Sequence, residues 1–155
     1  MITIEKLTES SVEKVRQILL TEEQVTFAGT AEEFLKSGTD TIALHIIKLK
    51  NEVVGFFKID VGYTLGDEFF IENGLGLRAF AIDIKHQGKG LGTLCVKALF
   101  SYLKENYSSY SFMYLTVNCK NLSAFACYLK GGFKDTGKKY VAGAAGPQYI
   151  MQLKI

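Results

Sequence analysis

A glycine-rich segment in the second half of the chain is the stretch whose composition most directly suggests chemistry. It reads Gln87-Gly88-Lys89-Gly90-Leu91-Gly92-Thr93, between an apolar run typical of a buried strand and the strongest helical pattern in the sequence. At such a turn, successive backbone N–H groups point outward at the positive end of the helix dipole. Because glycine has no Cβ, the backbone can approach a ligand closely. The segment predicts an anion-binding cradle; a glycine-rich turn without a ligand is the alternative.

The spacing of the glycines narrows the kind of anion. A nucleotide P-loop needs GxxxxGK[ST], which the segment does not supply. The dinucleotide fingerprint GxGxxG needs a third glycine where Thr93 stands. The spacing that does match is Q/R-x-x-G-x-G/A, carried by Gln87, Gly90 and Gly92.

A second motif lies on a later helical segment. Helical spacing places Asn121, Ala124 and Tyr128 along one face. The neighbouring face carries the residues expected in the core, namely Leu122, Phe125, Ala126 and Leu129. The polar face is therefore tilted between core and solvent, as a ligand-lining face would be. A tyrosine packed at a helix edge is the alternative for Tyr128.

The elements that must position these motifs follow from the periodicity of apolar residues. The predicted strands are Ile2–Lys6, Thr41–Lys50, Val53–Val61, Leu75–Ile84, Phe112–Val117, Phe133–Tyr140 and Gln148–Leu153. The predicted helices are Val12–Leu20, Ala31–Lys36, Gly90–Asn106 and Asn121–Lys130. The order β-α-α-β-β-β-α-β-α-β-β predicts an α/β fold with a mixed, mostly antiparallel sheet flanked by helices.

The turns between these elements have their own patterns. Lys50–Asn51–Glu52 predicts the tip of a hairpin, and the polar, acidic stretch Gly62–Gly74 predicts a loop. Thr8 or Ser10 is expected to cap the first helix. Gly131–Gly132 is expected to end the last one.

Composition and charge bound the class of protein. The 155 residues are about the size of one domain, and no linker or repeat divides them, so residues 1–155 are expected to form a single domain. Apolar residues make up 48%, enough for a packed core. The 18 basic and 16 acidic residues leave a net charge of +2, too small and scattered to favour nucleic acid as a partner.

Cysteine and histidine usage argues against disulfides and metals. Cys95, Cys119 and Cys127 are an odd number without a pairing pattern, and buried thiols in a reducing cytoplasm are expected. No CxxC or HExxH occurs, so no metal site is expected, and His45 is expected to be structural. The chain shows neither a signal-peptide pattern nor a membrane-spanning apolar run, which predicts a cytoplasmic location away from membranes.

The two motifs, in this order, resemble those of the GNAT family of N-acetyltransferases. Phe80-Ala81-Ile82-Asp83 leads into the glycine-rich loop, and Gly132-Phe133 follows the helix of Asn121, Ala124 and Tyr128. Each motif alone is weak, but the ordered combination is specific. The resemblance covers nearly the whole chain and is tightest over Leu77–Phe133.

The resemblance implies an acetyl-CoA-dependent N-acetyltransferase with acetyl-CoA as cosubstrate. The loop would hold the pyrophosphate, and the end of the preceding strand would pair with the pantetheine arm and polarise the thioester carbonyl. Asn121 would contact the cofactor, and Tyr128 would lie near the sulfur. The expected cofactor-binding residues are Phe80, Ala81, Ile82, Gln87, Gly88, Lys89, Gly90, Leu91, Gly92, Thr93 and Asn121.

The proton transfers that this reaction requires then assign the catalytic role to Tyr128. An amine with a free pKa of about 10 must lose a proton to attack, and the expelled thiolate must gain one. Tyr128 is expected to be that general acid. Direct attack needs no enzyme nucleophile, so no cysteine is assigned a role. Some family members carry a glutamate where Thr116 stands, so the base is left open among water and the loop carboxylates Asp67, Glu68 and Glu72.

The acceptor is expected to be a small amine. Glu22-Glu23-Gln24 with Phe27-Ala28, expected to lie between the first two helices, resembles bacterial polyamine acetyltransferases. An acidic wall of Glu22, Glu23 and the three loop carboxylates would suit a polycation. An amino acid or an aminoglycoside stays open, and so does a non-catalytic acyl-CoA sensor. The family often dimerises; a homodimer would use the edge formed by the last strands.

Overall fold

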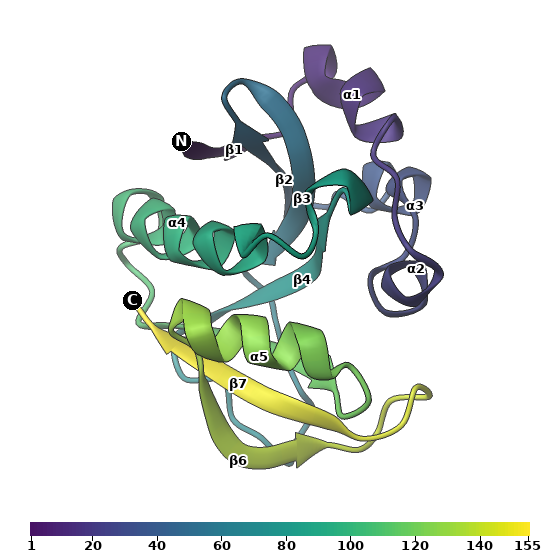
Figure 1. Ribbon diagram of the computed structural model, residues 1–155. Helices are drawn as coiled ribbons and strands as arrows, with labels where there is room; N and C mark the ends of the chain where they lie inside the picture. The colour runs from purple at the N-terminus through teal and green to yellow at the C-terminus, as the bar shows by residue number, and fades with distance from the viewer.

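Seven strands form one mixed sheet in the computed structural model, which describes all residues from 1 to 155 (Figure 1). The strands are β1 Ile2–Lys6, β2 Ile42–Leu49, β3 Glu52–Asp60, β4 Gly74–Ile82, β5 Phe112–Asn118, β6 Lys134–Tyr140 and β7 Gln148–Lys154. Their order in the sheet is β1-β2-β3-β4-β5-β7-β6. Every neighbouring pair is antiparallel except β4 and β5, which are parallel. The predicted α/β fold with a mixed, mostly antiparallel sheet is confirmed.

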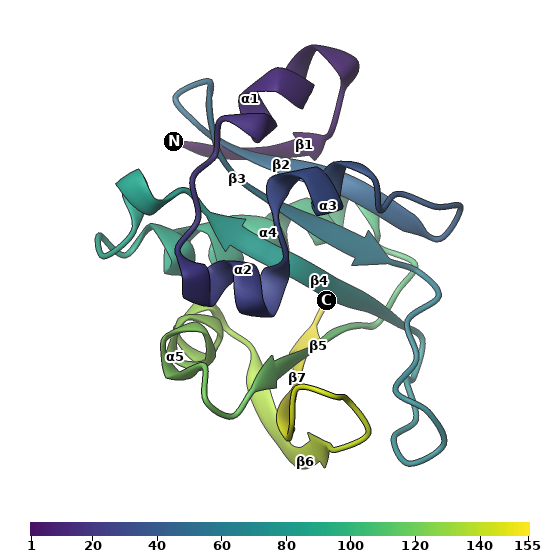
Figure 2. The ribbon, with the colours of Figure 1, turned by 90° about the vertical axis from the view of Figure 1, so that its right-hand side faces the viewer.

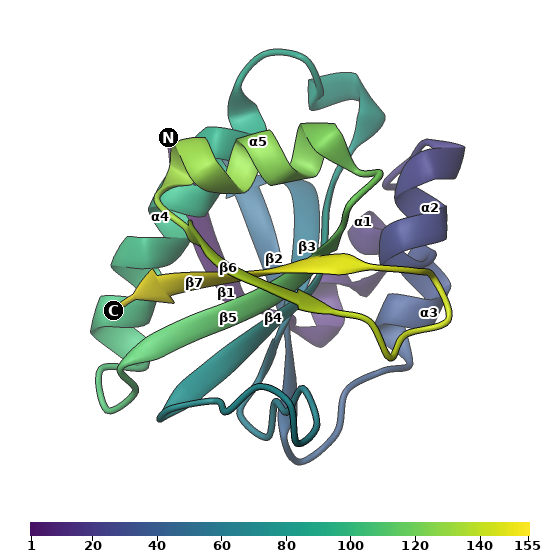
Figure 3. The same cartoon turned by 90° about the horizontal axis from the view of Figure 1, so that it is seen from below.

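Helices cover both faces of the sheet. They are α1 Val12–Arg16, α2 Glu22–Ala28, α3 Ala31–Leu35, α4 Leu91–Asn106 and α5 Leu122–Gly131. The helices α4 and α5 pack on one face around a large apolar core, while α1 and α3 pack on the other around Phe34 and Phe56. Figure 3 shows α4 and α5 together, with α2 and α3 apart from them. None of the helices has both the length and the hydropathy needed to cross a bilayer.

Local sequence explains the elements that were predicted. Lys50 and Asn51 have φ values of 50° and 69°, the left-handed pair that closes a two-residue hairpin between β2 and β3. Gly132 ends α5 in the left-handed conformation, as a helix-terminating glycine does. The acidic stretch after β3 contains no helix or strand until β4 begins.

The first helical region differs from the prediction. The helix expected over Val12–Leu20 ends at Arg16, and Thr8 precedes a 3-10 turn without capping it through its side chain. Residues 22–28, expected to lie between helices, form α2. The reason is a capping box: the Thr21 hydroxyl accepts from the Gln24 N–H, while the Gln24 side chain accepts from the Thr21 N–H.

The sheet opens between β4 and β5. These strands pair only over Gly74–Gly76 and Phe112–Tyr114, although β4 continues to Ile82 and β5 to Asn118 (Figure 2). Ala79, with a φ of 56°, lies where the β3–β4 register shifts, and such a bulge bends a strand. The facing backbones of the two strands are thus left free of each other beyond the first three pairs. The start of α4 and the helix α5 lie beside this opening.

Candidate active site

A cavity of about 630 Å³ lies at the opening of the sheet. Its walls come from the end of β4, the loop 86–93 with the start of α4, the outer face of α5, and α2. Most of the predicted site residues meet here: Phe80, Ile82, Gln87, Gly88, Gly90, Leu91, Gly92, Thr93, Asn121 and Tyr128. Two motifs that are separated by some thirty positions in the sequence therefore share one cavity.

Two predicted residues lie outside the lining of this cavity. The side chain of Ala81 is 1% exposed and packs in the core beneath α1 and α3. Its carbonyl lies against Gly55 on β3, so Ala81 contributes to the open edge of β4 only by positioning its two neighbours. Lys89 lies at the exposed tip of the loop, between two lining glycines.

The loop before α4 has the geometry of an anion cradle. Gly88 and Gly90 both have a φ of 76°, a conformation that favours glycine, and a Cβ at either would meet no atom within 4 Å. None of the consecutive N–H groups from Gly88 to Thr93 donates to a backbone carbonyl of the chain. These donors lie at the positive end of α4, a helix of 16 residues. The residues present therefore fit a phosphate-bearing ligand.

The first residue of the loop motif has its side chain engaged inside the protein. The Gln87 amide Nε2 donates to the Ile82 carbonyl at 2.9 Å and to the Gln24 Oε1 at 2.6 Å. Asp83, which follows β4, caps the short turn before the loop by accepting from the Lys85 N–H. The Gln87 side chain therefore holds the loop against the end of β4, whereas the backbone N–H groups that follow it are left for a ligand.

Tyr128 is held by aromatic contacts on two sides. Its ring meets those of Phe80 and Phe133 edge to face, with centroids 5.9 and 5.6 Å apart. Tyr128 is 9% exposed and lines the cavity. In the chain as a whole, every fully buried side-chain polar atom has a hydrogen-bond partner. Burial raises the pKa of Tyr128, and the neighbouring Cys127 raises it further. The hydroxyl therefore stays protonated at neutral and mildly alkaline pH.

The cysteines do not have the features of nucleophiles. Cys127 lines the cavity beside Gly92, where an added Cβ would lie 3.0 Å from its sulfur. Burial raises the pKa of Cys127, an effect that the Thr93 hydroxyl partly offsets, and burial raises that of Cys95 to about 12. Cys95 is buried as expected, whereas Cys119 and Cys127 are half-buried. Thiols that stay protonated are poor nucleophiles, so Cys95 and Cys127 are left without a catalytic role, and Cys119 does not line the cavity.

Only one of the expected acidic residues lines the cavity. Glu23 projects from α2, whereas Glu22 on the same helix does not reach the lining. Asp67, Glu68 and Glu72 are exposed in the loop between β3 and β4, and none of them lines the cavity either. The expected acidic wall therefore reduces to a single carboxylate at this cavity.

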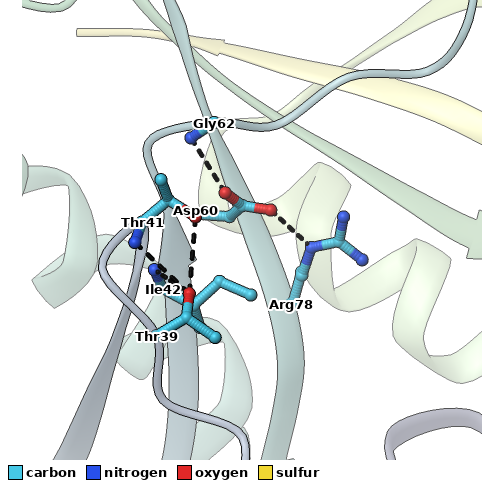
Figure 4. A network of polar contacts seen from close by, with 6 residues as sticks. All are labelled: Thr39, Thr41, Ile42, Asp60, Gly62 and Arg78. Atoms are coloured by element: carbon cyan, nitrogen blue, oxygen red, sulfur yellow. Dashed lines mark hydrogen bonds and ion pairs between the residues drawn. The ribbon is translucent and has the colours of Figure 1, made fainter.

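An ion pair between the buried Asp60 and the exposed Arg78, away from the cavity, was not predicted. Asp60 is 5% exposed, and its Oδ2 accepts from the Arg78 Nε at 2.9 Å, while its Oδ1 accepts from the Gly62 N–H (Figure 4). The Arg78 guanidinium also lies over the Tyr63 ring, 4.9 Å from its centroid. These contacts fix β3 to β4 beside the bulge at Ala79. Asp60 and Arg78 are single charged residues on two different strands, so no sequence motif indicated that they would form an ion pair.

Comparison with known proteins agrees with this geometry. The family model described as Acetyltransferase (GNAT) family matches residues 12–133. The spermine/spermidine N(1)-acetyltransferase of Bacillus subtilis (strain 168) is 27% identical over 142 residues, covering 88% of this chain and 90% of that protein.

Two solved structures share the fold. The aminoglycoside acetyltransferase AAC(6')-Ib in complex with coenzyme A has a TM-score of 0.80 at 24% identity, covering 99% of this chain and 95% of that one. The spermidine N-acetyltransferase of Vibrio cholerae in complex with CoA and spermine has a TM-score of 0.71 at 15% identity, with coverage of 99% and 95%.

Proposed function

The chain belongs to the acetyltransferase (GNAT) family, and on that premise we propose that it moves the acetyl group to the primary amine of a small molecule by direct attack. It is an acetyl-CoA-dependent N-acetyltransferase, with acetyl-CoA as cosubstrate. We take residues 1–155 as one such domain. The observation that carries the proposal is the meeting of the free N–H groups at the start of α4 with the Tyr128 hydroxyl in one cavity.

The residues at the opening of the sheet fit an extended, phosphate-bearing ligand. The N–H groups from Gly88 to Thr93 would hold the pyrophosphate. The edge of β4 over Phe80–Ile82 would pair with the pantetheine arm as an added strand does, apart from the Ile82 carbonyl, which already accepts from the Gln24 and Gln87 amides. Asn121 lines the same cavity at the start of α5, where its Oδ1 accepts from the Ala124 N–H at 3.4 Å and its amide Nδ2 is left for the ligand. The bound cosubstrate supplies a thioester that an amine can attack.

Tyr128 then has the properties of the acid. Burial keeps the proton on its hydroxyl at neutral pH, and the flanking rings of Phe80 and Phe133 fix where the hydroxyl lies. The departing thiolate takes this proton, and the phenolate that is left regains one from water. A backbone N–H at the end of β4 would polarise the carbonyl under attack. No protein nucleophile takes part, because the cysteine nearest the cavity stays protonated.

The amine loses its proton to water. Asp67, Glu68 and Glu72 lie outside the cavity lining, and Thr116 on β5 has no titratable group. Glu23 is better suited to attract a cationic acceptor, because its carboxylate is exposed on α2 at the cavity wall. A polyamine is the first acceptor to test, supported by Glu23 and by the B. subtilis relative; amino acids and aminoglycosides follow.

A thiol-release assay with acetyl-CoA tests the proposal. The panel contains spermine, spermidine, lysine, an aminoglycoside and several peptides. Release with a small amine above that with peptides supports the proposal, and the best substrate names the acceptor class. Release with peptides alone, or none with any amine although calorimetry shows acetyl-CoA binding, would contradict it. The second result would favour an acyl-CoA sensor in place of a small-molecule enzyme.

A further inference from the structure

Helix α2 forms one wall of the active-site cavity but is weakly packed. It contributes Glu23, Gln24, Phe27 and Ala28 to the lining. None of its residues is buried, and Phe27 is 37% exposed. A helix of seven residues has too few hydrogen bonds to be stable alone, so its position must come from contacts with the rest of the molecule.

Gln24 supplies the polar contacts that join α2 to the cofactor side of the cavity. Its Nε2 donates to the carbonyl of Ile82, the last residue of β4, at 2.9 Å. Its Oε1 accepts from the Gln87 Nε2 at 2.6 Å and from the Thr21 N–H at 2.9 Å. One side chain therefore contacts the end of β4, the first residue of the cradle loop and the start of its own helix.

The two glutamines form a closed arrangement around one carbonyl. The Gln87 Nε2 also donates to the Ile82 oxygen at 2.9 Å, so that oxygen accepts from both side chains. Any shift of the loop at Gln87 therefore changes the hydrogen bond that the Gln87 Nε2 donates to the Gln24 Oε1. The helix that faces the acceptor and the loop that would hold the pyrophosphate share this hydrogen-bond network.

We propose that Gln24 is a positioning residue that couples cofactor binding to the acceptor side of the cavity. The inference rests on the proposed function, because it takes Gly88–Thr93 as the cradle and α2 as the acceptor wall. A ligand that orders the cradle fixes Gln87, which fixes Gln24 and with it α2. Acetyl-CoA or CoA then strengthens acceptor binding by roughly 10-fold, within the usual range of coupling between two sites.

Two substitutions separate this role from helix capping. Gln24→Glu keeps the Oε1 atom that accepts from Thr21 and from Gln87, and glutamate is a natural third residue of a capping box. Its second carboxylate oxygen replaces the donor to the Ile82 carbonyl and is repelled by that oxygen, so the contact of α2 with the end of β4 is lost. Gln24→Met removes all the contacts and keeps the length. Thr30→Ala is the matched control, since Thr30 and Glu33 form an equivalent capping box on α3, and neither lines the cavity.

Hydrogen exchange of the amides of residues 22–28, with and without CoA, tests the coupling without turnover. We expect CoA to slow exchange in the wild type and in Thr30→Ala, and to do so much less in the two Gln24 variants, although calorimetry shows CoA still bound. Equal protection in all four proteins, or none in the wild type with CoA bound, would overturn the inference. Failure of CoA to bind the wild type would instead overturn the cradle assignment, and this inference with it.

Kinetics supplies a second readout that loss of fold would not imitate. With the best amine of the panel, Gln24→Glu should raise the KM for the acceptor by about 10-fold while kcat at saturation changes little. Thr30→Ala should leave that KM unchanged. A fall in kcat with an unchanged acceptor KM in the Gln24 variants would contradict a positioning role through α2.

Discussion

Tyr128 and Phe80 meet edge to face across the opening of the sheet, with ring centroids 5.9 Å apart and planes inclined by 65°. One residue comes from α5 and the other from β4, on the two sides of the place where β4 and β5 separate. Phe133 supports the tyrosine ring from behind, at 5.6 Å. The ring is therefore fixed by packing alone, and its hydroxyl is not needed to hold it.

This relationship makes Tyr128→Phe a clean test of the general acid. The variant keeps the ring contacts, so stability and acetyl-CoA affinity should change little. Because the proton donor to the thiolate is removed, kcat should fall by about 100-fold or more. Steady-state kinetics and calorimetry on the same preparation measure both quantities. A variant with wild-type kcat would show that water or another group protonates the sulfur.

Gly90 allows the charge of the cradle to be tested apart from its shape. Gly90→Glu should abolish acetyl-CoA binding, because a carboxylate at the N-terminus of α4 would compete with the pyrophosphate for the free N–H groups. Gly90→Ala is the control: it carries the same cost of the left-handed conformation, about 1 kcal/mol, without the charge.

Calorimetric titration with acetyl-CoA compares the two Gly90 variants. A Cβ at this position meets no atom within 4 Å, so the alanine variant should fold and bind, with moderately reduced affinity. If the folded glutamate variant bound acetyl-CoA as well as the alanine variant does, the pyrophosphate would have to lie elsewhere.

Features with a local cause were predictable from the sequence. The hairpin at Lys50–Asn51, the helix of Gly90–Asn106 and the cradle before it depend on turn residues and apolar spacing within a few positions. The short helix α2 could also have been predicted, because Thr21 and Gln24 have capping-box spacing. Its apolar pattern is weak, so the periodicity of apolar residues did not indicate it. A short helix without a buried face has too few regularly spaced apolar residues to be recognised from its sequence pattern.

Features with a long-range cause were not predictable in this way. The carboxylates of the β3–β4 loop were expected to join Glu23, yet sequence proximity to β4 does not bring Asp67 to the cavity. The sheet opens beside a bulge at Ala79, and where the β4–β5 pairing ends, the missing side chain of Gly76 leaves room for the Tyr63 ring. Such packing joins residues from different strands, so no single-strand pattern reveals it.

The charge of α2 gives a test of the acceptor class. Glu23→Gln should raise the KM for spermidine roughly 3-fold to 5-fold, the scale of a single exposed ion pair, and the effect should shrink at high salt. Glu22→Gln is the matched control, because it removes the same charge one position away on a side chain outside the cavity lining. Equal effects of the two substitutions would indicate general attraction by α2 in place of a contact at Glu23.

His45 should make the stability of the fold depend on pH. Its side chain is fully buried against Phe57, with its Nδ1 donating to the Ala43 carbonyl at 3.1 Å and its Nε2 accepting from the Tyr102 hydroxyl at 2.9 Å. Burial lowers the pKa of His45 to about 4, against an ordinary value of 6.5. The unfolded chain therefore binds a proton in this interval that the folded chain does not.

Because the unfolded state binds more protons between about pH 6.5 and pH 4, the free energy of unfolding should rise with pH across this window. The contribution of His45 is complete above pH 6.5 and is lost as the pH falls toward 4, by about 3 kcal/mol in all. Urea unfolding at several pH values measures it. Carboxylates also titrate near pH 4, so His45→Gln serves as the reference: the slope between pH 6.5 and 5 should flatten in the variant. A slope equal to that of the wild type would show that the buried imidazole accepts a proton without cost to the fold.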